Sequence, residues 1–222
     1  MAKVNVTRQK LIDGAMQVLV SEGVAGTTTR KIAEAAGVRL ATLHYHFKDK
    51  DALLFAVLEE VTSLLQKFLD EEIKPSPDLH HRIEELILAI WRLVRKTRDL
   101  QILQFEVTMY AVRRSDTAWL AEKQYEGYFD QYERILAQPR NDGCSKEQIR
   151  RLAQFVLAGL DGILVQDLAN PDEARTEQLL DSLVRASQAV AAQMASKRGT
   201  DDEKAAGSVE PAARLQRKKR PA

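Results

Sequence analysis

The sequence predicts an all-α protein. Its 222 residues are 45% hydrophobic, which is enough to bury a sizeable core. Glycine and proline are sparse, at 10 and 6 residues, and no run of alternating β-branched residues predicts a strand. We expect an N-terminal head of three helices over 1–50, a helical body over 51–198, and a disordered tail over 199–222 whose residues are small, polar or charged.

The first helix is expected over residues 7–22. Six apolar side chains recur there at helical spacing: Leu11, Ile12, Ala15, Met16, Leu19 and Val20. Gly23 and Gly26 follow directly, so we expect the helix to end there.

The most informative stretch is 27–47, which reads as two short helices joined by a tight turn. Gly37 lies between the helices, where a chain leaving a helix needs a left-handed residue. This is a helix-turn-helix, a unit that can place its second helix in the major groove of DNA. The two apolar faces comprise Ile32, Ala33 and Ala36 in the first helix and Leu40, Leu43 and Phe47 in the second.

The fourth helix should begin after Asp49, a good N-cap, and continue through Phe68. It is long enough to leave the head and enter the body. Loops are expected at 74–78 (KPSPD), at 139–143 (PRNDG) and at Asn170-Pro171. The remaining helices are then predicted over 79–97, 99–114, 116–138, 145–168 and 173–197.

Charge is unevenly distributed. Residues 1–50 hold 8 Lys or Arg and 4 Asp or Glu, whereas residues 51–198 hold 19 and 24. A basic head on an acidic body indicates that only the head meets a polyanion. The basic run at 217–220 is interpreted as part of a solvated tail, with nonspecific DNA binding or a targeting tag as the alternatives.

Several other classes of protein are disfavoured. No apolar run approaches the length of a membrane span, and the N-terminus lacks a signal pattern. Cys144 is the single cysteine, and His44 and His46 are two residues apart, so they point to different helix faces. We therefore expect no metal, no cofactor, no membrane partner and a cytoplasmic location. An all-α enzyme using Glu106, Tyr110 or Asp161 as acid or base is a remote alternative, because no nucleophile–base motif or phosphate loop is present.

The head resembles the TetR family of bacterial transcriptional regulators. The matching residues are Thr28, Thr29, Arg30, Ile32, Ala33, Ala36, Gly37, Val38, Thr42, Leu43, His46, Phe47, Lys50, Ala52 and Leu53. Segments 104–116 and 161–168 are similar to the choline-repressor-like branch. The resemblance implies a homodimer, a ligand pocket inside the body, and an operator that is released when ligand binds. Two residues depart from the family pattern: Arg39 replaces the usual Ser and His44 replaces the usual Tyr, so either His44 or Tyr45 could make the phosphate contact of that tyrosine.

Phosphate contacts are expected from Thr28, Thr29, Lys48 and Lys50, which lie around helix ends. Ordinary N-capping is the alternative for the threonines. A cation such as Lys50 at a helix N-terminus is unfavourable, which suggests an anion nearby, although a solvated charge is the alternative.

Base contacts are expected from the start of the second helix of the motif. Arg39 is the sharpest candidate, because a guanidinium can bond O6 and N7 of guanine together, although a phosphate contact is an equal alternative. Leu40 and Ala41 could contact a thymine methyl, while Thr42 and Arg30 could reach a base or the backbone.

The body carries aromatic side chains on three helices, and these are the candidates for a ligand pocket. An aromatic stripe is more often plain core, so that alternative stays open for each of them. The candidates are Trp91, Phe105, Met109, Tyr110, Tyr125, Tyr128 and Phe129. Glu106 is expected to pair with Arg113 or Arg114 rather than with a ligand.

The last two helices have apolar faces that include small residues, which suits close packing against a second copy as a four-helix interface. Intrachain core is the alternative. The candidate interface residues are Phe155, Ala158, Gly162, Val165, Leu183, Ser187, Val190 and Met194.

The sequence thus predicts a dimeric repressor that binds a pseudo-palindromic operator in double-stranded DNA and is released by a small-molecule effector. The alternative is a DNA-binding regulator without a small-molecule ligand, controlled by a protein partner or acting structurally.

Overall fold

A computed structural model of the chain describes residues 2–137 and 144–207, with side chains described over 6–137 and 144–195. All regular secondary structure in these ranges is helical, which confirms the predicted all-α class. The helices are α1 (Ala2–Gly26), α2 (Thr29–Ala35), α3 (Leu40–His46), α4 (Lys50–Glu72), α5 (Leu79–Lys96), α6 (Arg98–Val112), α7 (Ala118–Leu136), α8 (Lys146–Ala169) and α9 (Glu173–Gly207).

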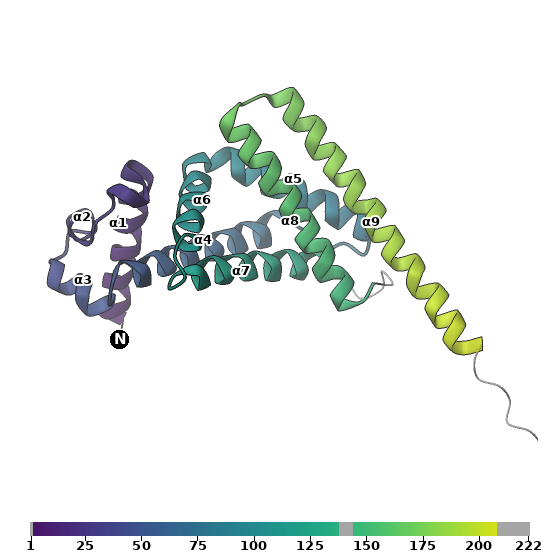
Figure 1. The fold of residues 1–222 in the computed structure, drawn as a ribbon, viewed down its shortest axis with the longest axis horizontal. Coiled ribbons are helices and arrows are strands. Elements are labelled where there is room, and N and C mark those ends of the chain that lie inside the picture. The colour runs from purple at the N-terminus through teal and green to yellow at the C-terminus, as the bar shows by residue number, and fades with distance from the viewer. Residues whose placement is uncertain (1, 138–143, 208–222) are drawn as a thin grey trace, which may run out of the picture.

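Helices α1, α2 and α3 form a head at one end of the molecule (Figure 1). The head core is made by apolar residues of all three helices, including the fully buried Leu11, Ile32 and Leu43. Gly14 permits the close crossing of α1 and α2, because a Cβ at this position would lie 2.9 Å from the backbone nitrogen of Ala36.

The turn between α2 and α3 has the predicted form. Gly37 has a φ of 64°, the left-handed conformation that favours glycine. Its amide donates to the carbonyl of Glu34, and the next amide, that of Val38, donates to the carbonyl of Ala33. These bonds close the end of α2 and redirect the chain into α3.

Helix α4 links the head to the body. The carboxylate of Asp49 accepts from the amide of Ala52, so the predicted N-cap is confirmed. Near its start α4 buries Leu53 and Leu54 in the head core, and near its end it buries Leu65 and Leu69 in the body core. The head core also includes residues of α6 and α7, so helices that follow residue 50 complete the core of the head.

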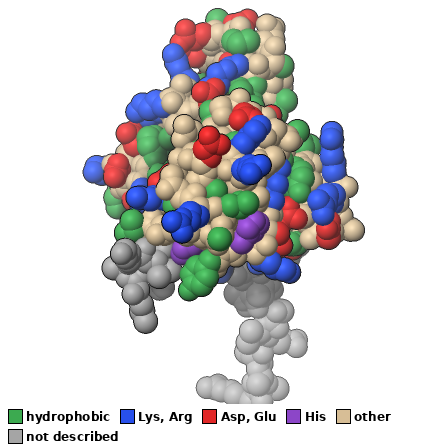
Figure 2. Space-filling model, turned by 90° about the vertical axis from the view of Figure 1, so that its left-hand side faces the viewer, with side chains coloured by type: hydrophobic (Ala, Val, Ile, Leu, Met, Phe, Trp, Pro, Cys, Tyr) green, Lys and Arg blue, Asp and Glu red, His purple; other side chains and the backbone are tan. Residues whose placement is uncertain are grey.

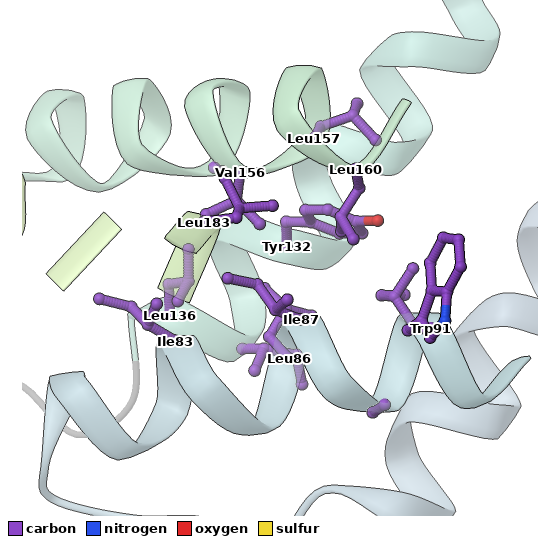
Figure 3. Packing of buried hydrophobic residues seen from close by; sticks show 14 of the residues in the cluster. Ile83, Leu86, Ile87, Trp91, Tyr132, Leu136, Val156, Leu157, Leu160 and Leu183 are labelled. Carbon is purple, nitrogen blue, oxygen red and sulfur yellow. The ribbon is translucent and has the colours of Figure 1, made fainter. Parts of the chain in front are cut away.

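The body core lies among α4, α5, α7, α8 and α9. Figure 3 shows Ile83, Leu86 and Ile87 of α5 directed toward Leu136 of α7 and toward Val156 of α8. Arg82 is also fully buried. Its guanidinium donates to the carbonyls of Ser76 and Leu136, which offsets the cost of burying the charge and closes the end of α7.

Two helices are longer than predicted. Helix α1 continues through Gly23, where a φ of 66° marks a kink rather than an end. Helix α9 continues to Gly207, so residues 199–207 are helical and not part of a disordered tail. The predicted loop at 139–143 and the tail from 208 onward lie outside the described residues.

Candidate DNA-binding surface and effector cavity

The start of α2 presents its polar side chains outward. Thr28 is the N-cap of α2, and its hydroxyl accepts from the amide of Lys31 at 3.3 Å. Thr28 and Arg30 are exposed, and Thr29 is half-buried. Capping and a phosphate contact are compatible here, because a hydroxyl can donate outward while it accepts from an amide.

Helix α3 turns one face to the core and leaves the other free. Leu43 is fully buried and Phe47 nearly so, while Leu40 is 39% exposed and Tyr45 is 79% exposed. The outer face also includes Arg39, Ala41 and His44, with Thr42 half-buried at its edge. Figure 2 views the head side of the molecule, where Lys, Arg and His side chains lie close together around hydrophobic ones.

Lys50 does not have the position expected of it. Its ammonium donates to the carbonyls of Val24 at 2.6 Å and Thr27 at 2.9 Å, so carbonyls at the end of α1 compensate the cation, and no nearby anion is required. Burial lowers the pKa of Lys50. Lys48, in contrast, is exposed and remains the better candidate for a phosphate contact.

The histidines of α3 take part in the surface rather than in a metal site. His44 is exposed, and His46 is half-buried with its ring against the edge of Tyr45. Within the described part of the chain, no group of three His, Cys, Asp or Glu side chains could hold a metal ion.

A cavity of about 280 Å³ lies in the body between α4, α5, α6, α7 and α8. Trp91, Tyr132, Leu157 and Leu160 stand around one space in Figure 3. The wall is mostly apolar and comprises Val61, Leu64, Leu65, Ile90, Trp91, Leu93, Val94, Thr97, Leu100, Gln101, Gln104, Tyr128, Tyr132, Leu157, Leu160, Asp161 and Leu164.

A hydrogen-bond network lines one end of this cavity. The hydroxyl of Tyr128 donates to Oε1 of Gln104 and accepts from Nε2 of Gln124 at 3.1 Å. The hydroxyl of Thr108 in turn donates to Oε1 of Gln124 at 2.6 Å. Burial raises the pKa of Tyr128, so this tyrosine is neutral at physiological pH.

Asp161 lies beside this network. It lines both the main cavity and a smaller adjoining pocket of about 30 Å³, which Phe105 and Tyr125 also line. The hydroxyl of Tyr125 donates to its carboxylate at 2.9 Å. Burial raises the pKa of Asp161, and the bond from Tyr125 opposes that shift.

The aromatic candidates therefore lie in different surroundings. Trp91 and Tyr128 line the main cavity, and Phe105 and Tyr125 line the small pocket. The other three candidates line neither space. Met109 is half exposed outside both spaces, the hydroxyl of Tyr110 donates to Asp51 at the base of α4, and Phe129 packs under the guanidinium of Arg150.

Helix periodicity did not single out the polar members of the cavity wall. Gln101 and Gln104 of α6 and Asp161 of α8 line it, whereas the sequence pattern offers Asp161 only as a remote enzymatic acid. The available signal is a carboxylate inside the apolar stretch 155–165, and it identifies a site only once the neighbouring helices are placed.

Glu106 has a different partner from the arginines expected. Its carboxylate accepts from the amide of Val24 at 2.9 Å, directly after the kink in α1. Gly23 is required there, because its φ is positive and a Cβ would lie 2.8 Å from Oε2 of Glu106. Body helix α6 thus holds the end of head helix α1.

Helix α8 leaves one apolar face open. Phe155 and Val165 are 41% and 50% exposed, and Ala158 and Gly162 between them are also exposed. This helix is long and apolar enough to cross a membrane by length and composition, since an 18-residue window in it has a mean hydropathy of 1.4, contrary to the expectation that no apolar run approaches that length. Its opposite face lies in the body core, as expected of a helix in a packed protein.

The candidates on α9 are placed differently. Leu183 and Ser187 are buried within the chain, and Leu183 packs on Gly159, where a Cβ would lie 2.4 Å from its Cδ1. Val190 and Met194 are partly buried against the same core. The burial of Leu183 and Ser187 within one chain favours the intrachain alternative for these two residues, and Leu183 packs on α8 at Gly159.

Comparison with known proteins agrees with this arrangement. The family model described as "Bacterial regulatory proteins, tetR family" matches residues 11–57, and "Tetracyclin repressor-like, C-terminal domain" matches residues 77–188. The nicotine-responsive transcriptional repressor HdnoR of Paenarthrobacter nicotinovorans is 30% identical over 183 residues, covering 81% of this chain and 92% of that protein.

Other relatives match over different extents. The class D tetracycline repressor of Escherichia coli is 43% identical over 61 residues, which is 28% of this chain and 27% of that repressor. Among solved structures, the multidrug binding protein EbrR in complex with ethidium has a TM-score of 0.62 and 26% identity, covering 81% of this chain and 97% of that one.

Proposed function

Because the chain belongs to the TetR family of bacterial transcription regulators, whose members are not enzymes, we propose that it is a repressor whose homodimer leaves its operator when a small molecule enters the cavity. The observation that carries the proposal is that three helices, α4, α6 and α7, contribute both to the head core and to the cavity wall. A ligand that moves any of these helices acts on the head that carries the DNA-binding surface.

The outer face of α3 is the proposed reader of operator DNA. Arg39 stands at its start and is exposed, so its guanidinium is free to approach a guanine edge in the major groove. Leu40 and Ala41 follow on the exposed side, where an apolar contact to a thymine methyl is possible. Thr28, Thr29 and Lys48 are the proposed phosphate contacts.

Two heads are needed to read a pseudo-palindrome, and the open face of α8 is the proposed dimer interface. Beyond the adjoining residues and backbone of α8 itself, no described atom lies within 4 Å of the position that a Cβ of Gly162 would take, so the backbone of a partner helix can approach closely there. Phe155 and Val165 would supply the apolar contact on either side.

Small-molecule control is supported by the cavity and by two relatives. HdnoR is named as nicotine-responsive, and EbrR was solved with ethidium bound. The proposed route from the cavity to DNA runs along α6. Gln104 lines the cavity, and Glu106, two residues later, holds the amide of Val24, while Lys50 of α4 holds the neighbouring carbonyls.

The proposal is tested by selecting an operator from random duplex DNA and then screening small molecules for release, read by fluorescence anisotropy of the labelled operator. Leu93 of α5 is half-buried and lines the cavity, so Leu93→Trp should narrow the cavity. This variant is expected to bind the operator and to resist release. Operator binding that no compound weakens, in a protein whose melting temperature no compound raises, would favour the alternative of a regulator without a small-molecule ligand.

A further inference from the structure

The charge of the cavity wall restricts what the cavity can bind. Among the described residues that line the main cavity and its adjoining pocket, Asp161 is the one carboxylic acid, and no Lys, Arg or His is present. The wall around it is built from leucines, valines and aromatic rings. The ionised form therefore places one uncompensated negative charge in a largely apolar space.

The contacts of Asp161 leave room for a ligand. Within the described part of the chain its carboxylate has one hydrogen-bond donor, the hydroxyl of Tyr125 at 2.9 Å. A carboxylate can accept about four hydrogen bonds, so acceptor positions on the cavity side remain available. The hydroxyl of Tyr128 is already engaged with Gln104 and Gln124, so it does not compete for them.

The aromatic side chains favour the same charge. Trp91, Tyr128 and Tyr132 line the main cavity, and the faces of such rings attract cations. An anion would meet an uncompensated carboxylate and electron-rich rings, whereas a cation would gain from both.

We propose that the effector is a lipophilic monocation, in which one positively charged nitrogen pairs with Asp161 while its hydrocarbon or aromatic part fills the apolar space beside Trp91. The inference rests on the proposed function only in taking this cavity as the effector site. Ligand charge is thus selected by a single residue of α8, and ligand size by the leucines of α5 and α8.

The test uses two probes of the same shape. Phenyltrimethylammonium chloride carries a permanent charge, and tert-butylbenzene is its neutral isostere. Binding is followed by the fluorescence of Trp91 in a Trp119→Phe background, because Trp91 and Trp119 are the two tryptophans of the chain. We expect the cation to bind at least tenfold more tightly than the isostere at pH 7.5.

Two variants locate the preference. Asp161→Asn keeps the shape and an acceptor for Tyr125, and it should bring the two affinities within about twofold of each other. Glu147→Gln removes a carboxylate from the exposed start of α8, away from the cavity, and should leave the tenfold preference intact. Equal affinities in the parent protein, or a preference that survives Asp161→Asn, would overturn the proposal.

A pH titration keeps the test independent of any variant. The affinity for the permanently charged probe should fall as Asp161 becomes protonated, while the affinity for tert-butylbenzene should stay constant; parallel behaviour of the two probes would contradict the inference. Operator release is measured separately. Tight binding of the cation without release would refute the proposed function and leave the ligand class standing. Release by neutral compounds alone would support the proposed function and refute the ligand class.

Discussion

At the scale of single residues, the structure separates side chains that face outward from those that the fold already uses. Arg39 and Lys48 are exposed near the two ends of α3, whereas the ammonium of Lys50 is occupied by two carbonyls of its own chain. A cation that is already bonded inside the protein gains less from a phosphate than a free one does. Lys48 is therefore the better subject for a test of backbone binding.

We predict that Arg39→Ala relaxes the preference for one base pair of each half-site by about 1–3 kcal/mol, because a bidentate contact to guanine is lost. Lys48→Ala should instead weaken binding to all sequences alike. It should also reduce the slope of log affinity against log salt concentration by about one. Competition titrations on operator and scrambled DNA at several salt concentrations distinguish the two effects. Equal losses on every sequence for Arg39→Ala would remove its role in reading bases.

The second prediction at the residue scale concerns the ionisation of Asp161. Burial raises its pKa above the ordinary value of 3.8, so folding favours the neutral form. The stability contributed by that neutral form is fully present below pH 3.8 and is lost as pH rises through the higher folded-state pKa. The ionised carboxylate therefore lowers the stability of the ligand-free protein at neutral pH.

Asp161→Asn should accordingly raise the melting temperature at pH 7.5, by roughly 1–4 °C, because the variant is never charged. The advantage should shrink as pH falls and the parent carboxyl becomes protonated. Thermal melts at several pH values measure this difference. A melting temperature that falls in the variant at pH 7.5 would show that the ionised carboxylate is stabilised by contacts other than that with Tyr125.

At the scale of elements, the junction between α1 and α6 joins the two halves of the molecule. Helix α1 is kinked at Gly23, and Glu106 of α6 accepts from the amide that follows the kink. The hydroxyl of Thr27 donates to the carbonyl of Gly23, so the same short segment is bonded from both sides. The backbone of the head is thus positioned by a side chain of the body.

Gly23→Ala is predicted to cost about 1–2 kcal/mol of stability, because a left-handed residue acquires a Cβ. Part of the cost should come from the contact of 2.8 Å with Oε2 of Glu106. The same substitution in a Glu106→Ala background should therefore be less costly, leaving the backbone strain alone. Urea unfolding of the four proteins of this cycle measures the difference, and identical costs in both backgrounds would exclude the contact as a contributor.

At the scale of the whole molecule, α8 has two apolar faces with different roles. One face packs in the body core, and the other presents Phe155, Ala158, Gly162 and Val165 at the surface. Buried residues of α9 such as Leu183 fix its packing on α8 within one chain. An exposed apolar face of this kind is the ordinary mark of an interaction site, and a second copy is the partner we propose.

Ala158→Glu is predicted to produce a monomer, because it places a charge at the centre of the proposed interface. Operator affinity should then fall at least tenfold, since the two half-sites are no longer bound by linked heads. Ala118→Glu makes the same change at an exposed position of α7 and should remain dimeric. Analytical ultracentrifugation with anisotropy on operator DNA checks both; a dimeric Ala158→Glu protein would move the interface elsewhere.

The sequence by itself determined the helix-turn-helix. Apolar spacing places Leu43 and Phe47 inward, Gly37 makes the turn, and Asp49 starts α4. These features depend on residues close together in the chain, where helix period and capping chemistry act locally. The same local signals located the loops at 74–78 and at Asn170-Pro171 and most helix ends, but they misjudged Gly23, whose kink is held by a residue more than eighty positions away.

Tertiary structure alone decided which side chains share a space. The exposure of Met109, the partners of Lys50 and the inward face of α9 depend on how helices far apart in sequence cross one another. Periodicity gives the face of a helix but not its neighbour, so Trp91 and Asp161 became parts of one cavity only when α5 and α8 were brought together. Burial by neighbouring helices raises the pKa of Asp161 and encloses the volume beside it, and neither the raised pKa nor the cavity would be present in the isolated helix.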